Sequence, residues 1–233
     1  MPKTLLIEIA SDVVCPWCYI GKRRLEKALE SLKGEVEARI EWLPFQLNPD
    51  MPAGGVARAD YRRAKFGSLE KGRALDARVA QEGAGEGIAF AFERMQRTPN
   101  TIAAHRLIDL AQSQGKAGPV VDALFRAYFE EARDIGDAEV LAGIAHAAGV
   151  ENWPAGANAP QVAEQEERVR DLGVSGVQFV VYWYGNFLFD ALSFFVTAAL
   201  AMGVFAAFGR AEYVGDSTTA LATAILLLLY GTC

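Results

Sequence analysis

The sequence has few residues of the kinds that bind metals or form disulfides, with three cysteines and two histidines among 233 residues. A secreted scaffold held together by disulfides needs more cysteines in a shorter chain. A zinc site needs four ligands. Beyond Cys15 and Cys18, the usual ligand types outside the carboxylates are Cys233, His105 and His146, each isolated in the sequence. We therefore expect neither a disulfide framework nor a metal site.

Positive charge is also scarce. The formal net charge is −6, and no basic stripe runs along the sequence, so a nucleic-acid partner is not expected. Residues 1–6 contain a short apolar run without a small-residue cleavage site, unlike a signal peptide. A paired Cys-x-x-Cys in such a chain indicates a catalytic thiol pair in a reducing compartment. These features predict a cytoplasmic protein.

The first fifty residues show the pattern of a strand, a helix and a second strand. Residues 5–10 form an apolar run that predicts a buried strand. Pro16 suits the first position of a helix, where its missing N–H is no loss, and Gly34 ends that helix. Alternation over residues 39–45 predicts the second strand. The apolar stripe of the predicted helix consists of Leu25, Ala28, Leu29 and Leu32.

The middle of the chain has a different pattern. Between residues 57 and 172, apolar residues recur at helical spacing and the breaks are short. Thr101 and Asp137 stand where they can cap two of these helices. Residues 152–160 include two prolines and predict a loop. This part of the sequence predicts a helical segment.

The last part of the sequence carries little charge. Residues 187–208 are almost wholly apolar with Asp190 as their only charge, and a second apolar stretch covers residues 220–230. In one interpretation, the region from residue 173 onward supplies the last two strands and the final helix of a soluble sheet. In the other, residues 187–208 have the length of about 20 residues that crosses a bilayer. We favour the first, because only this region can complete the sheet.

The sequence Cys15-Pro16-Trp17-Cys18 carries the chemistry. Only a thiolate attacks a disulfide, and Cys15 falls at the predicted N-cap, where unpaired N–H groups and the helix dipole favour negative charge. Cys18 lies one turn further along, on the inward stripe, so we expect it to be less exposed. An outer nucleophile and an inner resolving thiol are what exchange through a mixed disulfide requires. Trp17 is expected to be exposed for substrate contact.

Several motifs follow one another along the chain. They are the runs SDVVCPWCYIGKRR at residues 11–24, FQLNP at 45–49, PNT at 99–101 with AHR at 104–106, LFRAYF at 124–129, DIGD at 134–137 and GVSGV at 173–177. Together they resemble the DsbA-like oxidoreductases of the FrnE type, and the likeness covers about residues 3–177. The number and order of the motifs make the resemblance specific.

The resemblance implies an α/β, thioredoxin-like fold in which a large all-helical insertion separates an N-terminal βαβ unit from a C-terminal ββα unit. The thioredoxin-like domain then comprises residues 1–50 and 173–233, and the insertion comprises residues 51–172. Cys15 is implied as the nucleophile and Cys18 as the resolving thiol. The implied partners are protein or small-molecule disulfides and thiols. No cofactor is implied beyond the redox-active disulfide, with glutathione as a candidate co-substrate.

The resemblance also implies a substrate groove bordered by Pro16, Trp17, Val177 and the residue after it. The family has at that next position a proline that follows a cis peptide bond and faces the dithiol, whereas this chain has Gln178. A cis bond before a residue other than proline costs about 2.5–4 kcal/mol. We therefore expect the groove wall to move and the activity to be lower than in relatives with the proline.

Three functions stay open at this point. A thiol–disulfide oxidoreductase is favoured. A glutathione-dependent isomerase or transferase, related to the 2-hydroxychromene-2-carboxylate isomerases and kappa-class glutathione transferases, shares the inserted fold but usually has serine where this chain has Cys15. An inactive or membrane-tethered remnant, or a shifted reading frame, is the third, motivated by Gln178 and the apolar tail. The sequence leaves a homodimer, the physiological substrate and the direction of electron flow open.

Overall fold

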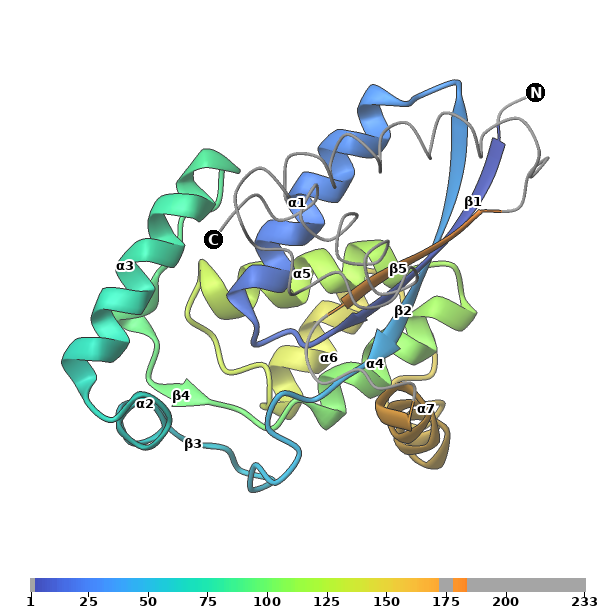
Figure 1. Ribbon diagram of the computed structural model, residues 1–233. Coiled ribbons are helices and arrows are strands. Elements are labelled where there is room, and N and C mark those ends of the chain that lie inside the picture. The colour runs from blue at the N-terminus through green and yellow to red at the C-terminus, as the bar shows by residue number, and fades with distance from the viewer. Residues whose placement is uncertain (1–2, 172–177, 184–233) are drawn as a thin grey trace, which may run out of the picture.

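The computed structural model describes residues 3–171 and 178–183 (Figure 1). In chain order the elements are β1 (Lys3–Ser11), α1 (Pro16–Ser31), β2 (Val36–Pro44), β3 (Val56–Ala57), α2 (Arg58–Phe66), α3 (Leu69–Gly85), the 3-10 helix η1 (Phe92–Arg94), β4 (Arg97–Thr98), α4 (Ile102–Ser113), α5 (Ala117–Phe129), α6 (Ala138–Ala147), α7 (Ala159–Asp171) and β5 (Gln178–Trp183).

The main sheet has the strand order β2-β1-β5. β1 pairs in parallel with β2, from Lys3 opposite Val36 to Ser11 opposite Pro44. α1 supplies the crossover between them, so the predicted βαβ unit is confirmed. β5 runs antiparallel to β1, with Ala10 opposite Gln178. β5 is therefore the first strand of the predicted C-terminal ββα unit. The second strand and the final helix of that unit lie outside the described residues.

Helix α1 begins where the sequence predicts. Pro16 is its first residue and Cys15 its N-cap, with φ −92° and ψ 112°. The helix ends at Ser31, and Gly34 then adopts a φ of +89°, which a residue without a Cβ takes at little cost. Leu25 and Leu29 pack against the core as the stripe predicts. Leu32 is exposed instead, because it is the C-cap and lies beyond the helix.

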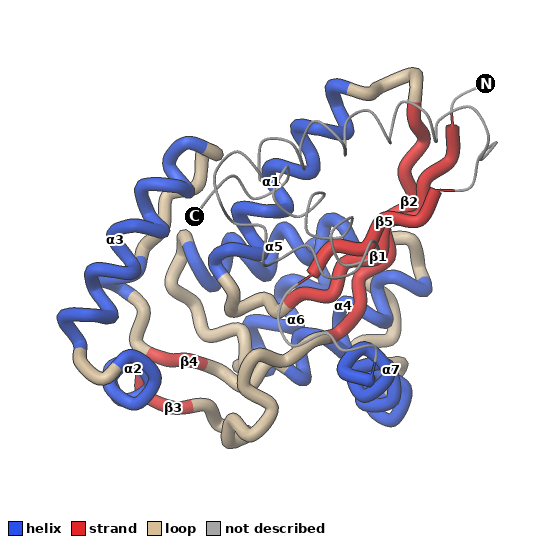
Figure 2. Tube along the Cα trace, in the orientation of Figure 1, coloured by secondary structure: helices blue, strands red, loops and turns tan. Residues whose placement is uncertain are grey.

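The segment between β2 and β5 is mainly helical, as predicted. It also contains an antiparallel pair of two-residue strands that the sequence did not indicate, with Val56 opposite Thr98 and Ala57 opposite Arg97. Figure 2 shows this pair beside α2 and apart from the main sheet. Runs of two residues are too short for a periodic signal. The pairing holds the start of α2 next to the chain that leads into α4.

The two predicted caps have different outcomes. The Asp137 carboxylate accepts hydrogen bonds from the backbone N–H groups of Glu139 and Val140 at 2.8 and 3.1 Å, so its cap on α6 is confirmed. Thr101 occupies the N-cap of α4, but its side chain makes no capping bond there. The side-chain oxygen of Asn100 accepts from the N–H of Ile102 at 2.9 Å instead.

One continuous apolar core connects the sheet with the helical segment. It includes Ile7 and Ile9 of β1 as well as Leu124 and Phe125 of α5, all essentially inaccessible to solvent. Tyr19 of α1 stacks on Phe125 with ring centroids 5.0 Å apart and planes inclined by 7°. α4 and α7 lie beside β2 (Figure 1). The dithiol end of α1 is therefore held between the sheet and the inserted helices.

No helix within residues 3–171 is long and apolar enough to cross a membrane. Both interpretations of the apolar tail, as a final helix or as a membrane span, fall on residues outside the described part of the chain.

Candidate active site

Cys15 and Cys18 lie in the first turn of α1, and both are free thiols. The Cys15 N–H donates to the carbonyl of Asp12 at 3.0 Å, which fixes the tight turn that enters the helix. The Cys15 carbonyl accepts from the N–H of Cys18 at 3.1 Å. Cys15 is 7 % exposed and Cys18 is 1 % exposed, so Cys18 is the more buried thiol, as expected, although Cys15 also has little contact with solvent.

The surroundings drive the pKa values of the two thiols apart. A hydrogen bond with the Cys18 side chain lowers the pKa of Cys15, and backbone N–H groups of Cys18 and Trp17 lower it further, against the opposing effects of burial and of the Asp12 carboxylate. Burial raises the pKa of Cys18 well above its ordinary value, and its position beside Cys15 raises it further. The thiolate form, which is the form that attacks a disulfide, is therefore favoured at Cys15 relative to Cys18.

Asp12 is a buried carboxylate beside the dithiol that the sequence did not single out. It is 1 % exposed, and its Oδ2 atom accepts from the backbone N–H of Leu47 at 2.8 Å. Its Oδ1 atom lies 3.4 Å from Nε2 of the buried His105. Within the described residues, neither of those two atoms has a hydrogen bond of good geometry. A buried negative charge here opposes ionisation of both thiols, which limits how far the pKa of Cys15 falls.

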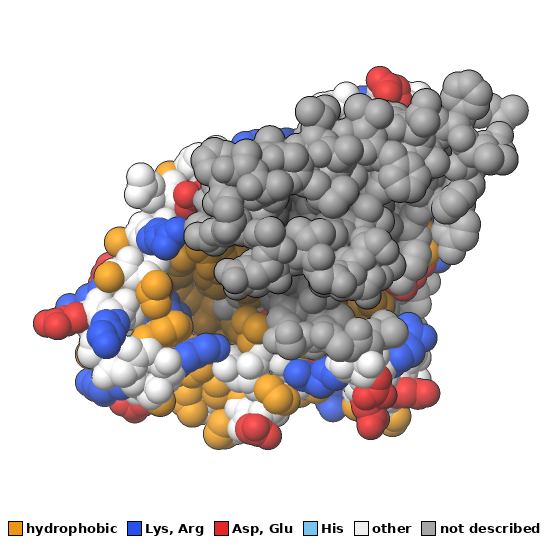
Figure 3. Space-filling view, viewed as in Figure 1, with side chains coloured by type: hydrophobic (Ala, Val, Ile, Leu, Met, Phe, Trp, Pro, Cys, Tyr) orange, Lys and Arg blue, Asp and Glu red, His pale blue; other side chains and the backbone are white. Residues whose placement is uncertain are grey.

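A cavity of about 460 Å³ opens beside the dithiol. One wall is the start of α1, with Cys15, Pro16 and Trp17, and the facing wall is built by α2 and α3. In Figure 3 the molecule is hollowed beside α2 and α3, with apolar side chains in the walls of the hollow and Lys or Arg side chains at its rim. Tyr128 and Phe129 of α5 also line the cavity. The predicted substrate contacts Pro16 and Trp17 are therefore placed at a cavity, and Trp17 is half-buried there.

The other two predicted substrate contacts, Val177 and Gln178, are not among the described residues that line this cavity. Val177 lies outside the described part of the chain. Gln178 is the first residue of β5 and stands opposite Ala10 of β1. Its backbone is therefore in register with the end of the strand that leads to Asp12 and the dithiol.

The facing wall of the cavity is basic, which no pattern in the sequence indicates. Asp76 of α3 pairs with two arginines of α2: Arg62 at 2.6 Å and Arg58 at 3.2 Å. The three side chains are 12–17 % exposed. Each guanidinium also lies against an aromatic ring, Arg58 over Phe92 at 5.4 Å and Arg62 over Phe66 at 4.3 Å. Ion pairs and aromatic contacts together fix these cations at the cavity.

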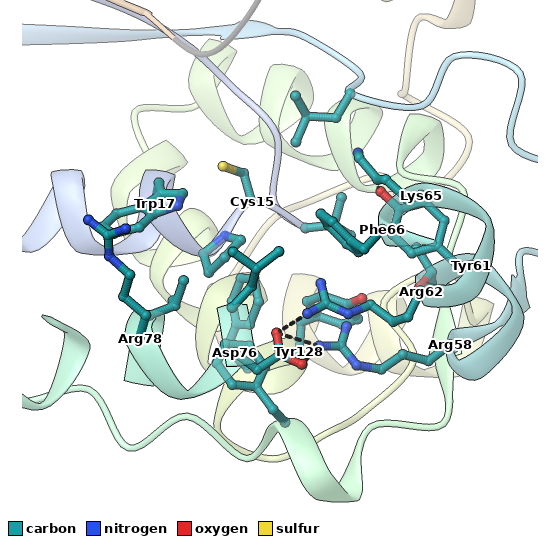
Figure 4. Close-up of a pocket in the computed structure, with 18 residues that line it drawn as sticks. Cys15, Trp17, Arg58, Tyr61, Arg62, Lys65, Phe66, Asp76, Arg78 and Tyr128 are labelled. Atoms are coloured by element: carbon teal, nitrogen blue, oxygen red, sulfur yellow. Dashed lines mark hydrogen bonds and ion pairs between the residues drawn. The ribbon is translucent and has the colours of Figure 1, made fainter. Parts of the chain in front are cut away.

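Lys65 and Arg78 complete the basic lining. Figure 4 shows Arg78 on the Trp17 side of Cys15 and Lys65 on the opposite side, near Tyr61 and Phe66. Lys65 donates to the Tyr61 hydroxyl at 2.6 Å. These positions were missed because α2 and α3 are remote from the dithiol in sequence, and exposed lysines and arginines on helices are ordinary surface residues.

Within the part of the chain that the structure describes, no group of three or more histidine, cysteine, aspartate or glutamate side chains gathers in a way that could hold a metal ion.

A dithiol at the start of the first helix of a βαβ unit, followed by a helical segment and an antiparallel strand, defines a thioredoxin-like protein of the DsbA type. Residues 6–200 match the model of the DSBA-like thioredoxin domain, and the chain belongs to that family. The crystal structure of a probable DsbA oxidoreductase from Streptomyces coelicolor is 30 % identical, with a TM-score of 0.69 over 76 % of this chain and 80 % of that one.

Two curated proteins are also similar over part of the chain. The uncharacterized protein YwbO of Bacillus subtilis is 26 % identical over 148 residues, which are 64 % of this chain and 68 % of that protein. A stretch of 58 residues, a quarter of this chain, is 43 % identical to the retinal-specific phospholipid-transporting ATPase ABCA4 of Bos taurus. That stretch spans 2 % of the transporter, so it carries no transport activity over to this chain.

Proposed function

We propose that the protein is a thiol–disulfide oxidoreductase that uses Cys15 as its nucleophile and Cys18 as its resolving thiol. The observation that carries the proposal is that the two thiols, within one helical turn, differ in burial and have pKa values shifted in opposite directions. Cys15 is the N-cap of α1 with a lowered pKa, and Cys18 is the more buried residue with a raised pKa. Membership of the DSBA-like family supports the same assignment.

The exchange proceeds in two balanced steps. The Cys15 thiolate attacks one sulfur of a substrate disulfide, which forms a mixed disulfide with Cys15 and releases the other half of the substrate as a thiolate that takes up a proton. Cys18 then loses its proton and attacks the Cys15 sulfur. This forms the Cys15–Cys18 disulfide and releases the second half of the substrate. Two electrons pass from the protein to the substrate, and the reverse sequence oxidises a dithiol.

The reaction needs no prosthetic group, because the cysteine pair itself carries the electrons. The substrates in this proposal are protein or small-molecule disulfides and thiols, with glutathione as a candidate co-substrate. The proposal places the reaction in the cytoplasm, where a catalytic thiol pair is kept reduced. Serine usually replaces the nucleophilic cysteine in the related glutathione-dependent isomerases, so the presence of Cys15 favours disulfide exchange over isomerisation.

We also propose that the chain divides into a thioredoxin-like domain of residues 1–50 and 173–233 and an inserted domain of residues 51–172. The pairing of β1 with both β2 and β5 supports this division, since none of the described elements between β2 and β5 contributes a strand to that sheet. Val177 and Gln178 are proposed as the wall of the groove contributed by the second part of the thioredoxin-like domain. The register of Gln178 opposite Ala10 supports the proposal.

Trapping of mixed disulfides tests the assignment of the two thiols. The Cys18→Ser variant should accumulate a covalent adduct with a peptide disulfide, because the resolving thiol is missing, whereas Cys15→Ser should neither form an adduct nor reduce the disulfide. Both variants are made with Cys233→Ser, so that mass spectrometry reports only the pair. An adduct in Cys15→Ser and none in Cys18→Ser would reverse the roles. No adduct and no reduction in any form would exclude the function.

A further inference from the structure

The cavity beside Cys15 has an excess of positive charge. Among the described residues that line it, four have cationic side chains, Arg58, Arg62, Lys65 and Arg78, and Asp76 is the only one with a carboxylate. The protein as a whole is acidic, with a formal net charge of −6. The basic lining therefore does not follow from the overall composition.

Among the residues that the structure describes, the partly buried cations Arg58 and Arg62 have too few counter-charges. Arg58 and Arg62 share the single carboxylate of Asp76. Both guanidinium groups are largely removed from water, and a charge in such a place is costly unless it is paired. Burial lowers the pKa of Arg62 despite the pull of Asp76, which is the direction expected for a cation that is not fully compensated. A second anion at this wall would complete the pairing.

Lys65 and Arg78 have no ion-pair partner among the described residues, whereas many other basic residues of the chain do. Lys65 donates to the neutral oxygens of Tyr61 and Asn48. The two cations flank Cys15, with Arg78 on the side of Trp17 and Lys65 across the cavity (Figure 4). A substrate whose sulfur reaches Cys15 therefore has a cation on each side.

We propose that this cavity binds a small disulfide or thiol that carries carboxylates on both sides of its sulfur, and that Lys65 and Arg78 select it. The reactive step rests on the proposed oxidoreductase function, but the binding step does not. A volume of about 460 Å³ lies in the range of small-molecule sites, so a small molecule of this kind fits the cavity. The apolar and aromatic lining takes the carbon chain between the charges.

The charges also have a kinetic role in this proposal. An anionic disulfide is repelled by the Cys15 thiolate as it approaches. Positive side chains around the cavity offset that repulsion and raise the local concentration of the anion, an effect that weakens as salt increases. The preference for an anionic substrate should therefore fall when the ionic strength rises.

Three small disulfides of different charge test the proposal: dianionic dithiodipropionate, neutral hydroxyethyl disulfide and dicationic cystamine. The single-turnover rate of oxidation of the reduced protein is measured for each by mass spectrometry after acid quenching. Each rate is divided by the rate of the same disulfide with a free model dithiol, because the leaving thiol also affects exchange. The wild type should favour the dianion. In the Lys65→Gln/Arg78→Gln variant, the ratio of the normalised rate for the dianion to that for the neutral disulfide should fall about tenfold, or about threefold for each charge removed.

The matched control is Lys71→Gln/Arg73→Gln, which removes two exposed charges of α3 that do not line the cavity. It should keep the wild-type preference. Equal normalised rates for the three disulfides in the wild type would overturn the proposal, as would an unchanged preference in the Lys65→Gln/Arg78→Gln variant.

A binding measurement separates this proposal from the oxidoreductase function. Thiodipropionate, a dianionic thioether without a disulfide bond, is titrated against the wild type by calorimetry. If no disulfide oxidises the protein, the function fails. Binding of thiodipropionate that weakens in Lys65→Gln/Arg78→Gln but not in the control would still support the anion site. Absence of binding in the wild type would overturn it.

Discussion

Cys15 and Cys18 are three positions apart, yet their surroundings shift their pKa values in opposite directions. Cys15 receives a hydrogen bond from its partner and backbone N–H groups at the helix start, whereas Cys18 is surrounded by the core. The sequence predicted a lowered pKa for Cys15 and a more buried Cys18, because the N-cap position and the inward stripe are local properties of one helix. It did not predict the hydrogen bond between the two side chains, which is the largest cause of the lowered pKa. It did not predict Asp12, whose closeness to the pair depends on how the loop after β1 folds back toward Leu47.

At the residue scale, we expect Cys18→Ala to raise the pKa of Cys15, since the hydrogen bond from Cys18 is the largest cause that lowers it. In the wild type, Cys15 should be alkylated rapidly at neutral pH, and the rate of alkylation should fall as the pH drops through its lowered pKa. In Cys18→Ala that transition should move to higher pH. The rate of reaction with iodoacetamide against pH measures it.

The Cys18→Ser variant serves as the matched control, because its hydroxyl can still donate to the Cys15 thiolate, so its transition should move less. An unchanged or lower transition in Cys18→Ala would show that the helix N-terminus alone activates Cys15.

At the element scale, local signals located β1, α1, β2 and the cap of α6. The start of α1 follows from Pro16, and the cap of α6 follows from Asp137, which bonds to N–H groups within three residues. The pairing of β3 with β4 joins residues about forty positions apart in strands of two residues, so no local pattern announces it. The basic wall was missed for the same reason, since Arg62 and Asp76 meet only after α2 and α3 pack together.

A second prediction concerns Gln178, the first residue of β5. If Gln178 weakens the groove wall, Gln178→Pro should raise the turnover of a peptide disulfide. The reason is the smaller cost of a cis bond before proline, about 0.5–1 kcal/mol against about 2.5–4 kcal/mol before glutamine. Steady-state reduction by both proteins measures the change.

A Gln178→Ala variant, which cannot favour the cis bond, should not gain activity and serves as the control. Equal or lower turnover in a Gln178→Pro protein that keeps its wild-type circular dichroism would contradict the prediction.

At the scale of the whole molecule, one core serves both the sheet and the inserted helices. Phe125 is fully buried and stacks on Tyr19, so α5 is packed directly against the helix that carries the dithiol. We expect Phe125→Ala to lower the free energy of unfolding by about 3–5 kcal/mol, the usual cost of such a deletion in a core. Urea denaturation followed by circular dichroism measures it.

Leu32→Ala is the control for that measurement, because Leu32 is an exposed apolar residue at the end of α1 and its truncation should change stability little. A loss below about 1 kcal/mol in Phe125→Ala would mean that the site collapses around the missing ring, and that the shared core contributes less than its burial implies.

The position of the dithiol at the boundary between two structural parts has an evolutionary consequence. The reactivity of Cys15 is set by the first turn of α1, whereas the charges facing it come from α2 and α3. If Cys15 is the nucleophile and the cavity selects the substrate, as proposed, substitutions on those two helices should change which molecules are accepted without altering the reacting thiol. Gene duplicates of this chain would be expected to diverge first at positions such as 65 and 78, while the turn from Asp12 to Cys18 stays under constraint.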